Sequence, residues 1–253
     1  MDNVYIKGIG VLGPGLDSWE KAQSALKNGT GPDLSETPPQ AVADLLPPNE
    51  RRRAGAAIRL ALHVASEAVN ASGLSAEDLP TVFSSCHGDI RIAQKNCLSL
   101  TADRPFVSPT LFHNSVHNAP SGYWHIATGS QQPSNSISGG NDSFRAGLLE
   151  AAAMLTYAPA ALLVCSDPAL PAAFQPFDTI MNDFGVALVL AREFGEWGRL
   201  DFYADSGRDG PLEPDWLRTA VLRNPAARAL PILQAIASGQ AESFPDLGVR
   251  YQP

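Results

Sequence analysis

Short apolar runs and longer amphipathic segments alternate along this chain. The runs that predict strands, each with turn residues beside it, are 4–11, 79–85, 160–165 and 185–191. The last two contain no polar interruption, which is typical of strands buried on both faces of a sheet. Between the first two runs, residues 54–71 place Ile58, Leu62, Ala65 and Val69 at helical spacing. Buried strands separated by helices predict an α/β fold with a layered sheet.

The segment 131–155 combines three elements in a pattern found at many enzyme sites. A polar run at 133–138 predicts a strand, Gly139-Gly140 predicts a turn, and the Ala- and Leu-rich stretch that follows predicts a helix. Such a turn holds one side chain beside a helix N-terminus, where many α/β enzymes place a nucleophile. Here the position holds Asn141 and Asp142, and neither side chain can replace a Cys or Ser nucleophile.

The remaining segments predict further helices, one irregular surface excursion and a C-terminal tail without a strand pattern. The further helices are expected at 19–29, 90–100 and 111–128 (with Pro120 disturbing its middle), and one or two more at 216–238 around Pro225 and Pro231. Residues 30–50 are rich in proline, which predicts a surface excursion without regular structure. No strand pattern follows residue 197. We therefore expect an α/β domain at 1–197 and a C-terminal extension at 198–253 that is mostly helical or irregular.

Composition and charge narrow the classes of function. The sequence is 44% hydrophobic and 17% charged, as expected for a globular protein with a substantial core. Its net charge of −8 argues against binding of nucleic acid or of anionic membranes. The three cysteines lack a CxxC spacing, and the sequence has neither a signal peptide nor an apolar run of about 18 residues. These features predict a cytoplasmic protein without membrane insertion and without a recognisable cofactor motif.

Several residue patterns suggest chemistry, and each also has a structural interpretation. Gly8 and Gly10 are closely spaced, but the rest of a dinucleotide-binding fingerprint is absent, so a structural strand and turn is favoured. Asp178 and Asp183 flank a loop and could suggest an acid pair of the glycosidase kind, but solvated or capping carboxylates are the favoured interpretation. Arg51–Arg53 would suit an anion, although three arginines that open a surface helix are usually its solvated end.

The histidines and cysteines raise metal binding and nucleophilic catalysis as further hypotheses. His113 and His117 share one face of a predicted helix, with His125 farther along. No nearby acid or thiol completes a zinc site, so packing or interface contacts are the favoured role. Cys86 and His87 are an adjacent thiol and base. Neighbouring side chains on a strand point to opposite faces, which would arrange this pair poorly for catalysis.

Taken in order, three segments resemble the N-terminal half of a β-ketoacyl synthase, a condensing enzyme with the thiolase-like fold. The resemblance runs from about Tyr5 to Glu193, and its segments are YIKGIGVLGPGLDSWEKAQSALKNGTG (5–31), RRRAGAAIRLALHVASEAV (51–69) and FVSPTLFHNSVHNAPSGYWHIATGSQQPS (106–134). It implies one half of the layered thiolase-like α/β fold, followed by a short helical C-terminal extension. One sheet layer of that fold leaves an apolar face open, so we expect the C-terminal helices or a partner to cover it.

The resemblance also indicates what this chain lacks. Aligning Pro133-Ser134 with the Pro-Ser of the family places Asn141 at the position of the acyl-carrying cysteine. The family takes a lysine and two histidines, or a histidine and an asparagine, from its C-terminal half, whereas residues 198–253 contain no histidine. Condensation needs a thiolate nucleophile and donors that stabilise the enolate. We therefore expect no catalytic residues for condensation and no self-sufficient condensing activity.

An inactive homologue of this kind, the chain-length factor, pairs with an active ketosynthase in some systems and sets the length of the product. The chain resembles such subunits, and more narrowly the short ones that accompany aryl-polyene ketosynthases. The resemblance implies a heterodimer with a full-length β-ketoacyl synthase, through which the chain would meet an acyl carrier protein indirectly. The resemblance places Asn135, Ser136 and Ile137 at the interface, and Leu111, Phe112, Ser115 and Val116 along the partner's acyl tunnel.

Two other functions stay open at this point. One is a stand-alone acyltransferase or thioesterase that uses Cys86 or one of the serines in 134–138 as its nucleophile. The other is a scaffold that stabilises a ketosynthase without shaping its product.

Overall fold

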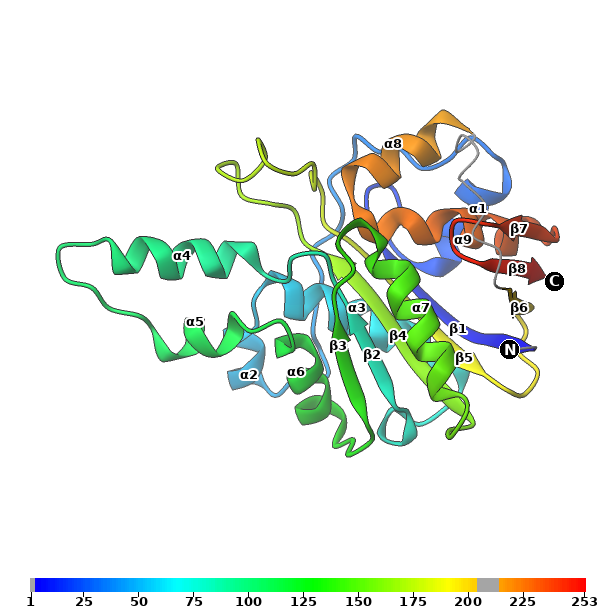
Figure 1. Cartoon of the computed structure of the whole chain (residues 1–253), viewed down its shortest axis with the longest axis horizontal. Helices are drawn as coiled ribbons and strands as arrows, with labels where there is room; N and C mark the ends of the chain where they lie inside the picture. The colour runs from blue at the N-terminus through cyan, green and yellow to red at the C-terminus, as the bar shows by residue number, and fades with distance from the viewer. Residues whose placement is uncertain (1–2, 204–213) are drawn as a thin grey trace.

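One mixed sheet organises the molecule. The structure is a computed structural model that describes residues 3–203 and 214–253. In these ranges the sheet has eight strands in the order β3-β2-β4-β5-β1-β6-β8-β7 (Figure 1). The strands are β1 Val4–Leu12, β2 Thr81–Ser84, β3 Ser134–Ile137, β4 Ala160–Asp167, β5 Phe184–Ala191, β6 Arg199–Phe202, β7 Glu242–Phe244 and β8 Val249–Gln252. β2 runs parallel to β3 and to β4, and the other neighbouring pairs are antiparallel.

Helices cover both faces of the sheet and give it two apolar cores. The helices are α1 Trp19–Lys27, α2 Pro48–Arg53, α3 Ala56–Ser72, α4 Ile90–Leu100, α5 Pro109–Asn114, α6 Ala119–Thr128, α7 Ser143–Met154, α8 Asp215–Arg223 and α9 Leu230–Ser238. α3 and α6 pack on one face around Trp124, and α1, α7 and α9 pack on the other around Phe144. Along β5, Leu188 faces the second core and Val189 the first. The prediction of strands buried on both faces of an α/β sheet is thereby confirmed.

The closely spaced glycines of β1 let α3 lie directly against the strand. A Cβ atom added at Gly8 would lie 2.0 Å from the carbonyl oxygen of Ala68, and one at Gly10 would lie 2.1 Å from that of Val64. Neither distance is physically possible, so any side chain here would force helix and strand apart. The structural interpretation of these glycines is therefore confirmed.

The C-terminal segment contributes strands that the sequence analysis did not predict. β6 pairs with β1, and β8 pairs with β6 and β7, so residues on both sides of 197 belong to one sheet. The expectation of a tail without strands was wrong. The sequence pattern that could have predicted these strands is short, because only the four residues of β8 alternate between buried and accessible positions. α9 packs onto the core of the same sheet. The domain division at residue 197 stays a prediction from the change in composition along the sequence.

Two expected helices have different bounds. The helix predicted over 111–128 is two helices, α5 and α6, with a short break between them. Pro120 lies in the first turn of α6, where its missing N–H costs no hydrogen bond. Arg51–Arg53 end the short helix α2 instead of opening α3, because the backbone is extended at Ala54 and Gly55.

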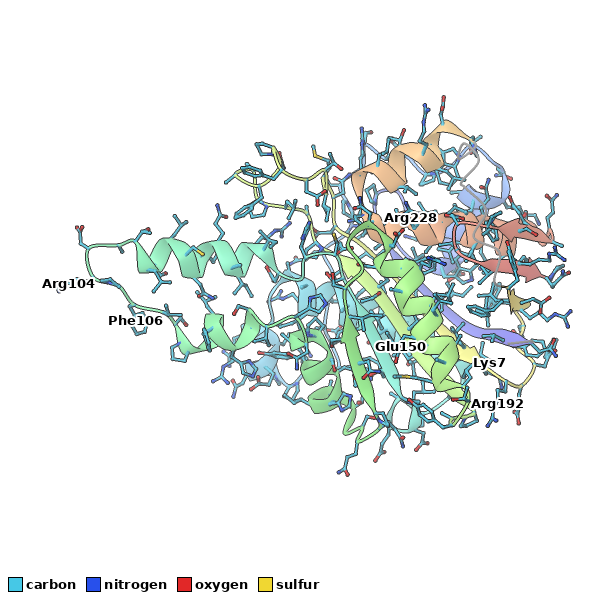
Figure 2. The ribbon with its side chains drawn as sticks, in the orientation of Figure 1. Lys7, Arg104, Phe106, Glu150, Arg192 and Arg228 are labelled. Carbon is cyan, nitrogen blue, oxygen red and sulfur yellow. The ribbon has the colours of Figure 1, made fainter. Side chains whose placement is uncertain are left out.

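α4 and α5 pack against each other and form an arm that projects from the body of the molecule (Figure 1). Figure 2 shows Arg104 and Phe106 at its tip. Apolar side chains are exposed along the arm, among them Phe106 at 68% and Phe112 at 66%. An apolar surface of this kind is typical of a region that another protein covers. No helix in the described ranges has the length and apolar character needed to cross a membrane.

The glycine contact in β1 predicts the effect of a single methyl group. Gly10→Ala should destabilise the fold by at least about 3 kcal/mol, because its methyl meets backbone atoms of α3 that cannot move aside. Gly122→Ala is the matched control, since the space around this exposed helical glycine is open, and it should stabilise by about 0.5–1 kcal/mol. Urea unfolding of the two variants measures both changes, and equal midpoints would contradict the close contact.

Candidate functional site

The predicted strand, turn and helix at 131–155 are present as β3, a short 3₁₀ turn at Gly140–Asp142, and α7. Gly140 has a φ of 58°, the left-handed conformation that glycine adopts without strain. The turn is held by Ser143, whose Oγ donates to the carbonyl of Gly140 over 2.7 Å and accepts from the Gly139 N–H over 3.1 Å. Asn141 lies exposed on this turn. An amide there can donate and accept hydrogen bonds, but it cannot form an acyl intermediate.

β3 is the end strand of the sheet, and β2 is its only neighbour among the described strands. The carbonyl of Pro133 accepts a hydrogen bond from the Thr81 N–H of β2, and the carbonyl of Ile137 accepts one from the Ser85 N–H just beyond that strand. Because main-chain groups alternate in direction along a strand, the N–H and C=O groups of Ser134 and Ser136 point to the outer edge. This edge presents hydrogen-bonding groups to which another strand can pair.

The three residues expected at a subunit interface all lie on β3. Asn135 is exposed, and its amide donates to Glu150 Oε1 over 2.6 Å. Ser136 is half-buried, and Ile137 packs partly against the core. Their side chains point to different faces of the sheet, so the outer main-chain edge is the feature that an interface along β3 would use.

The four residues expected along an acyl tunnel lie on or just beyond α5. Phe112 and Ser115 line an open groove of about 770 Å³ between α4 and α5. The other residues that line it are Ala93, Asn96, Cys97, Leu100, Val107 and Pro109. Leu111 is half-buried on α5, and Val116 is exposed in the break before α6. The structure thus brings two of the four residues to one apolar groove.

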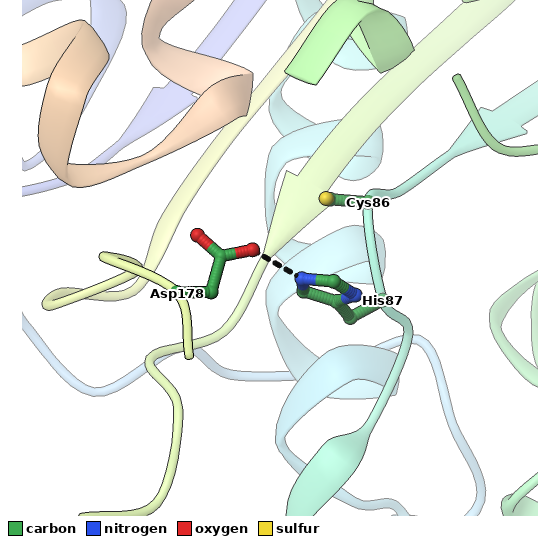
Figure 3. Close-up of side chains that lie close together, drawn as sticks. All are labelled: Cys86, His87 and Asp178. Carbon is green, nitrogen blue, oxygen red and sulfur yellow. Dashed lines mark hydrogen bonds and ion pairs between the residues drawn. The ribbon is translucent and has the colours of Figure 1, made fainter. Parts of the chain in front are cut away.

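Cys86, His87 and Asp178 form a compact cluster (Figure 3). Each residue offers one atom that could bind a metal ion, and these three atoms all lie within 4.8 Å of one another. His87 Nε2 and Asp178 Oδ2 are 2.6 Å apart. Since β2 ends at Ser84, Cys86 and His87 lie in the loop beyond it, and strand alternation does not separate them. The expectation that this pair is held apart on a strand was wrong.

Asp167 lies next to this cluster, at the end of β4. Its side chain is 1% exposed, and its Oδ1 accepts hydrogen bonds from Ser85 Oγ and from the Cys86 N–H, both over 2.7 Å. Its Oδ2 has no hydrogen-bond partner among the described residues. Burial raises the pKa of the Asp167 carboxyl, and the two hydrogen bonds offset this only in part.

The surroundings of Cys86 suppress its nucleophilic form. Burial, reinforced by the carboxylates of Asp167 and Asp178, raises the pKa of the Cys86 thiol to about 12. At neutral pH the thiol therefore keeps its proton, and a neutral thiol is a weak nucleophile. The cluster as it stands is not arranged for acyl transfer through Cys86.

The three histidines considered for a zinc site lie apart from one another. His113 belongs to α5 and hydrogen-bonds to Asn114 Oδ1 over 3.0 Å, whereas His117 lies beyond that helix and donates to the carbonyl of Ile137 over 2.9 Å. His125 is on α6. In the described ranges, the candidate metal-binding group is instead the cluster around His87.

Sequence reasoning missed Asp167 and interpreted Asp178 as a solvated or capping residue. The sequence contained part of a signal for Asp167, which follows the predicted strand 160–165. The parallel pairing that brings it to the end of β2, with Ser84 opposite Cys165, is seen only in the structure. Asp178 comes from an irregular loop, and no periodicity indicates its position. Asp183 accepts from the Ala169 N–H over 2.8 Å and pairs with Arg91, so it links the two ends of the loop between β4 and β5 and does not cap a helix.

The suppressed thiol predicts a specific order of cysteine reactivity. With a chelator present at pH 8, only about one Cys86 side chain in ten thousand is a thiolate, so iodoacetamide should modify it far more slowly than the exposed Cys97. Cys165 is fully buried and should not react in the folded protein. Peptide mass spectrometry over time measures the three rates. Rapid modification of Cys86 would contradict the raised pKa and favour a nucleophilic role.

Solved structures of ketosynthase complexes share this fold. The ketosynthase (ApeO) in complex with its chain length factor (ApeC) from Xenorhabdus doucetiae matches with a TM-score of 0.75 and 22% identity, over 99% of this chain and 98% of the matched one. The ishigamide ketosynthase/chain length factor matches with a TM-score of 0.63 and 17% identity, over 92% and 81%. A β-ketoacyl synthase from Burkholderia phymatum STM815 gives 0.60 and 15%, over 90% and 71%.

The family is established by sequence. A search of curated proteins returned no match. The family model described as beta-ketoacyl synthase, N-terminal domain, matches residues 19–242, a range that includes the arm, the edge strand and the turn that carries Asn141. The chain therefore belongs to the β-ketoacyl synthase N-terminal domain family, as its resemblance to that family predicted.

Proposed function

We propose that this chain is a non-catalytic, chain-length-factor subunit that pairs with an active β-ketoacyl-ACP synthase and shapes its acyl tunnel. The pathway class would be polyene or fatty-acid-like biosynthesis, with aryl polyenes the narrower expectation. The observation that carries the proposal is Asn141, an amide on an intact strand, turn and helix of a ketosynthase-family fold. In this proposal the turn corresponds to the one that presents the nucleophile in active family members, and the amide at its tip cannot carry an acyl group.

The structural matches support pairing with a ketosynthase. Two of the matched structures are complexes of a ketosynthase with a chain length factor. The chain matched in the ApeO–ApeC complex is spanned over 98% of its length, whereas 71% of the Burkholderia phymatum synthase is spanned. These two shares are what we expect if this chain is a short subunit that pairs with a longer, full-length synthase.

The free edge of β3 supports a strand-to-strand contact with the partner. Ser134 and Ser136 direct main-chain groups outward, and Ser, Asn and Ile side chains carry no charge that would repel a second strand. Main-chain pairing of this kind gives affinity from regular hydrogen bonds. The interface would thus be centred on Asn135, Ser136 and Ile137.

The groove on the arm supports a role in shaping the tunnel. Phe112 and Ser115 face an apolar space bounded by α4, and Val116 and Leu111 lie beside it. A growing acyl chain is apolar, and a wall of such side chains would limit its length by steric exclusion. The arm would then serve as the part of this subunit that reaches the partner's tunnel.

The charge of the chain supports carrier-protein docking on the partner. Acyl carrier proteins are acidic, and this chain has a net charge of −8. The basic segment Arg51–Arg53 is partly neutralised, because Arg51 pairs with Asp44 and Arg53 with Glu50. The alternative of a stand-alone enzyme that uses Cys86 is weakened by its protonated thiol.

Blocking the outer edge of β3 should weaken the heterodimer. Ser136→Pro removes one outward N–H and is expected to lower affinity for the cognate ketosynthase at least about tenfold, while Ser136→Ala keeps the main-chain donor and should bind normally. Co-expression followed by native mass spectrometry gives the yield of the one-to-one complex. Circular dichroism checks that both variants fold. Equal yields from the two variants would refute the strand pairing.

Filling the groove on the arm should shorten the product. Ser115→Phe places an aromatic ring in the space between α4 and α5, and the assembled ketosynthase should then release a shorter acyl chain. Ser99→Phe is a control on the same arm, because Ser99 does not line the groove. Mass spectrometry of the products measures their length. An intact complex with unchanged products would favour a scaffold that does not shape the tunnel.

A further inference from the structure

The cluster of Cys86, His87 and Asp178 has the composition of a transition-metal site. It offers a thiol, an imidazole and a carboxylate from two separate loops, with the donor atoms all within 4.8 Å of one another. Zn²⁺ binds these three kinds of ligand, whereas Mg²⁺ and Ca²⁺ prefer oxygen ligands alone. Figure 3 shows the three side chains converging, with the carboxylate of Asp178 facing the end of the imidazole that carries Nε2.

A second observation at the same place points to a cation. Asp167 is 1% exposed, is fixed against the Cys86 N–H, and has an Oδ2 without a hydrogen-bond partner among the described residues. Within the described ranges, no lysine or arginine forms an ion pair with Asp167 or Asp178. Arg91, which belongs to the same region, pairs with Asp183. In the part of the chain that the structure describes, two carboxyl groups and a thiol thus lie together beside His87, without an ion pair to a lysine or arginine.

The main chain already positions the three side chains. Ser138 Oγ donates to the Cys86 carbonyl over 3.0 Å, and Ser85 Oγ accepts from the Gly88 N–H over 2.8 Å, so the loop after β2 is held at both ends. On the opposite loop, the Thr179 N–H donates to Asp178 Oδ1, and Thr179 Oγ1 donates to the carbonyl of Leu222, both over 2.6 Å. The backbone of both loops is therefore already fixed before a metal ion binds.

The distances require only a small rearrangement. With Zn–N and Zn–O bonds of about 2.0–2.2 Å and a Zn–S bond of about 2.3 Å, ligand atoms of a tetrahedral site lie about 3.3–3.6 Å apart. The contact of 2.6 Å between His87 Nε2 and Asp178 Oδ2 would lengthen by less than about 1 Å, and the sulfur atom would move inward from within 4.8 Å. Side-chain rotations suffice for both changes.

We propose that Cys86, His87 and Asp178 bind one Zn²⁺ ion, with Asp167 as the buried carboxylate that orients Cys86 through its N–H. Binding replaces the thiol proton by the metal and so relieves the excess of negative groups. The ion would fasten the loop between β4 and β5 to the end of β2, and its fourth position would stay open to water or a partner side chain. The proposal is independent of the chain-length role.

Cobalt(II) tests this site directly, because it occupies zinc sites and absorbs light when bound to a thiolate. The full chain, stripped with a chelator and kept reduced with a phosphine, should bind one equivalent of Co²⁺ and develop a thiolate-to-cobalt charge-transfer band that Zn²⁺ abolishes. Cys86→Ser should remove the band, whereas Cys97→Ser, at an exposed cysteine outside the cluster, should keep it. His87→Gln and Asp178→Asn should each weaken Zn²⁺ binding at least about 100-fold, and Asp167→Asn about 10- to 100-fold.

Thermal unfolding supplies a second readout. Zn²⁺ should raise the Tm of the wild type and of Cys97→Ser but leave that of Cys86→Ser unchanged, because an ion that binds the folded state stabilises it. The Tm of each metal-free variant shows that it folds. Absence of the band in the wild type, or a band and a Tm shift that survive Cys86→Ser, would overturn the proposal.

Discussion

The parallel pairing of β3, β2 and β4 is the constraint on which the functional end of this molecule depends. Ser84 lies opposite Ile137 on one side and Cys165 on the other, so the three strands end at nearly one level. The segments that follow them must therefore meet at one edge of the sheet. They carry Asn141 after β3, Cys86 after β2, and the Asp167 terminus of β4. A shift of one residue in either register would separate these groups.

Much of the fold follows from sequence because the decisive segments have a single interpretation. β4 and β5 are uninterrupted apolar runs, which predicted burial on both faces of the sheet. α3 keeps one apolar stripe through four turns, which predicted a helix buried on one face. Gly8 and Gly10 were also readable as structural residues, since no phosphate-binding fingerprint accompanied them. The pattern alone predicted a turn that carries Asn141 and Asp142, and only the family resemblance led to the expectation that Asn141 takes the place of the cysteine.

Other features depend on contacts that a local pattern does not contain. β6, β7 and β8 have four, three and four residues, too few for alternation to be distinctive. They are strands because β1 offers an edge to β6, which pairs in turn with β8, and β8 with β7. The break between α5 and α6 was missed because a proline in a first helical turn resembles one in the middle of a helix. The cluster around Cys86 was missed because Asp178 reaches it from a distant loop, and a pattern along the chain cannot place one loop against another.

The two edges of the sheet differ in how open they are to pairing with another strand. β7 is short, and its outer residues Glu242 and Ser243 are exposed, with Arg250 donating to Ser243 from the neighbouring strand. Charged and short edge strands discourage pairing with another sheet. β3 carries neither charge nor proline, and half of its main-chain groups face outward without an intrachain partner in the described ranges. An edge of this composition is open to pairing with another strand, whether that strand comes from a partner or from an aggregating second copy.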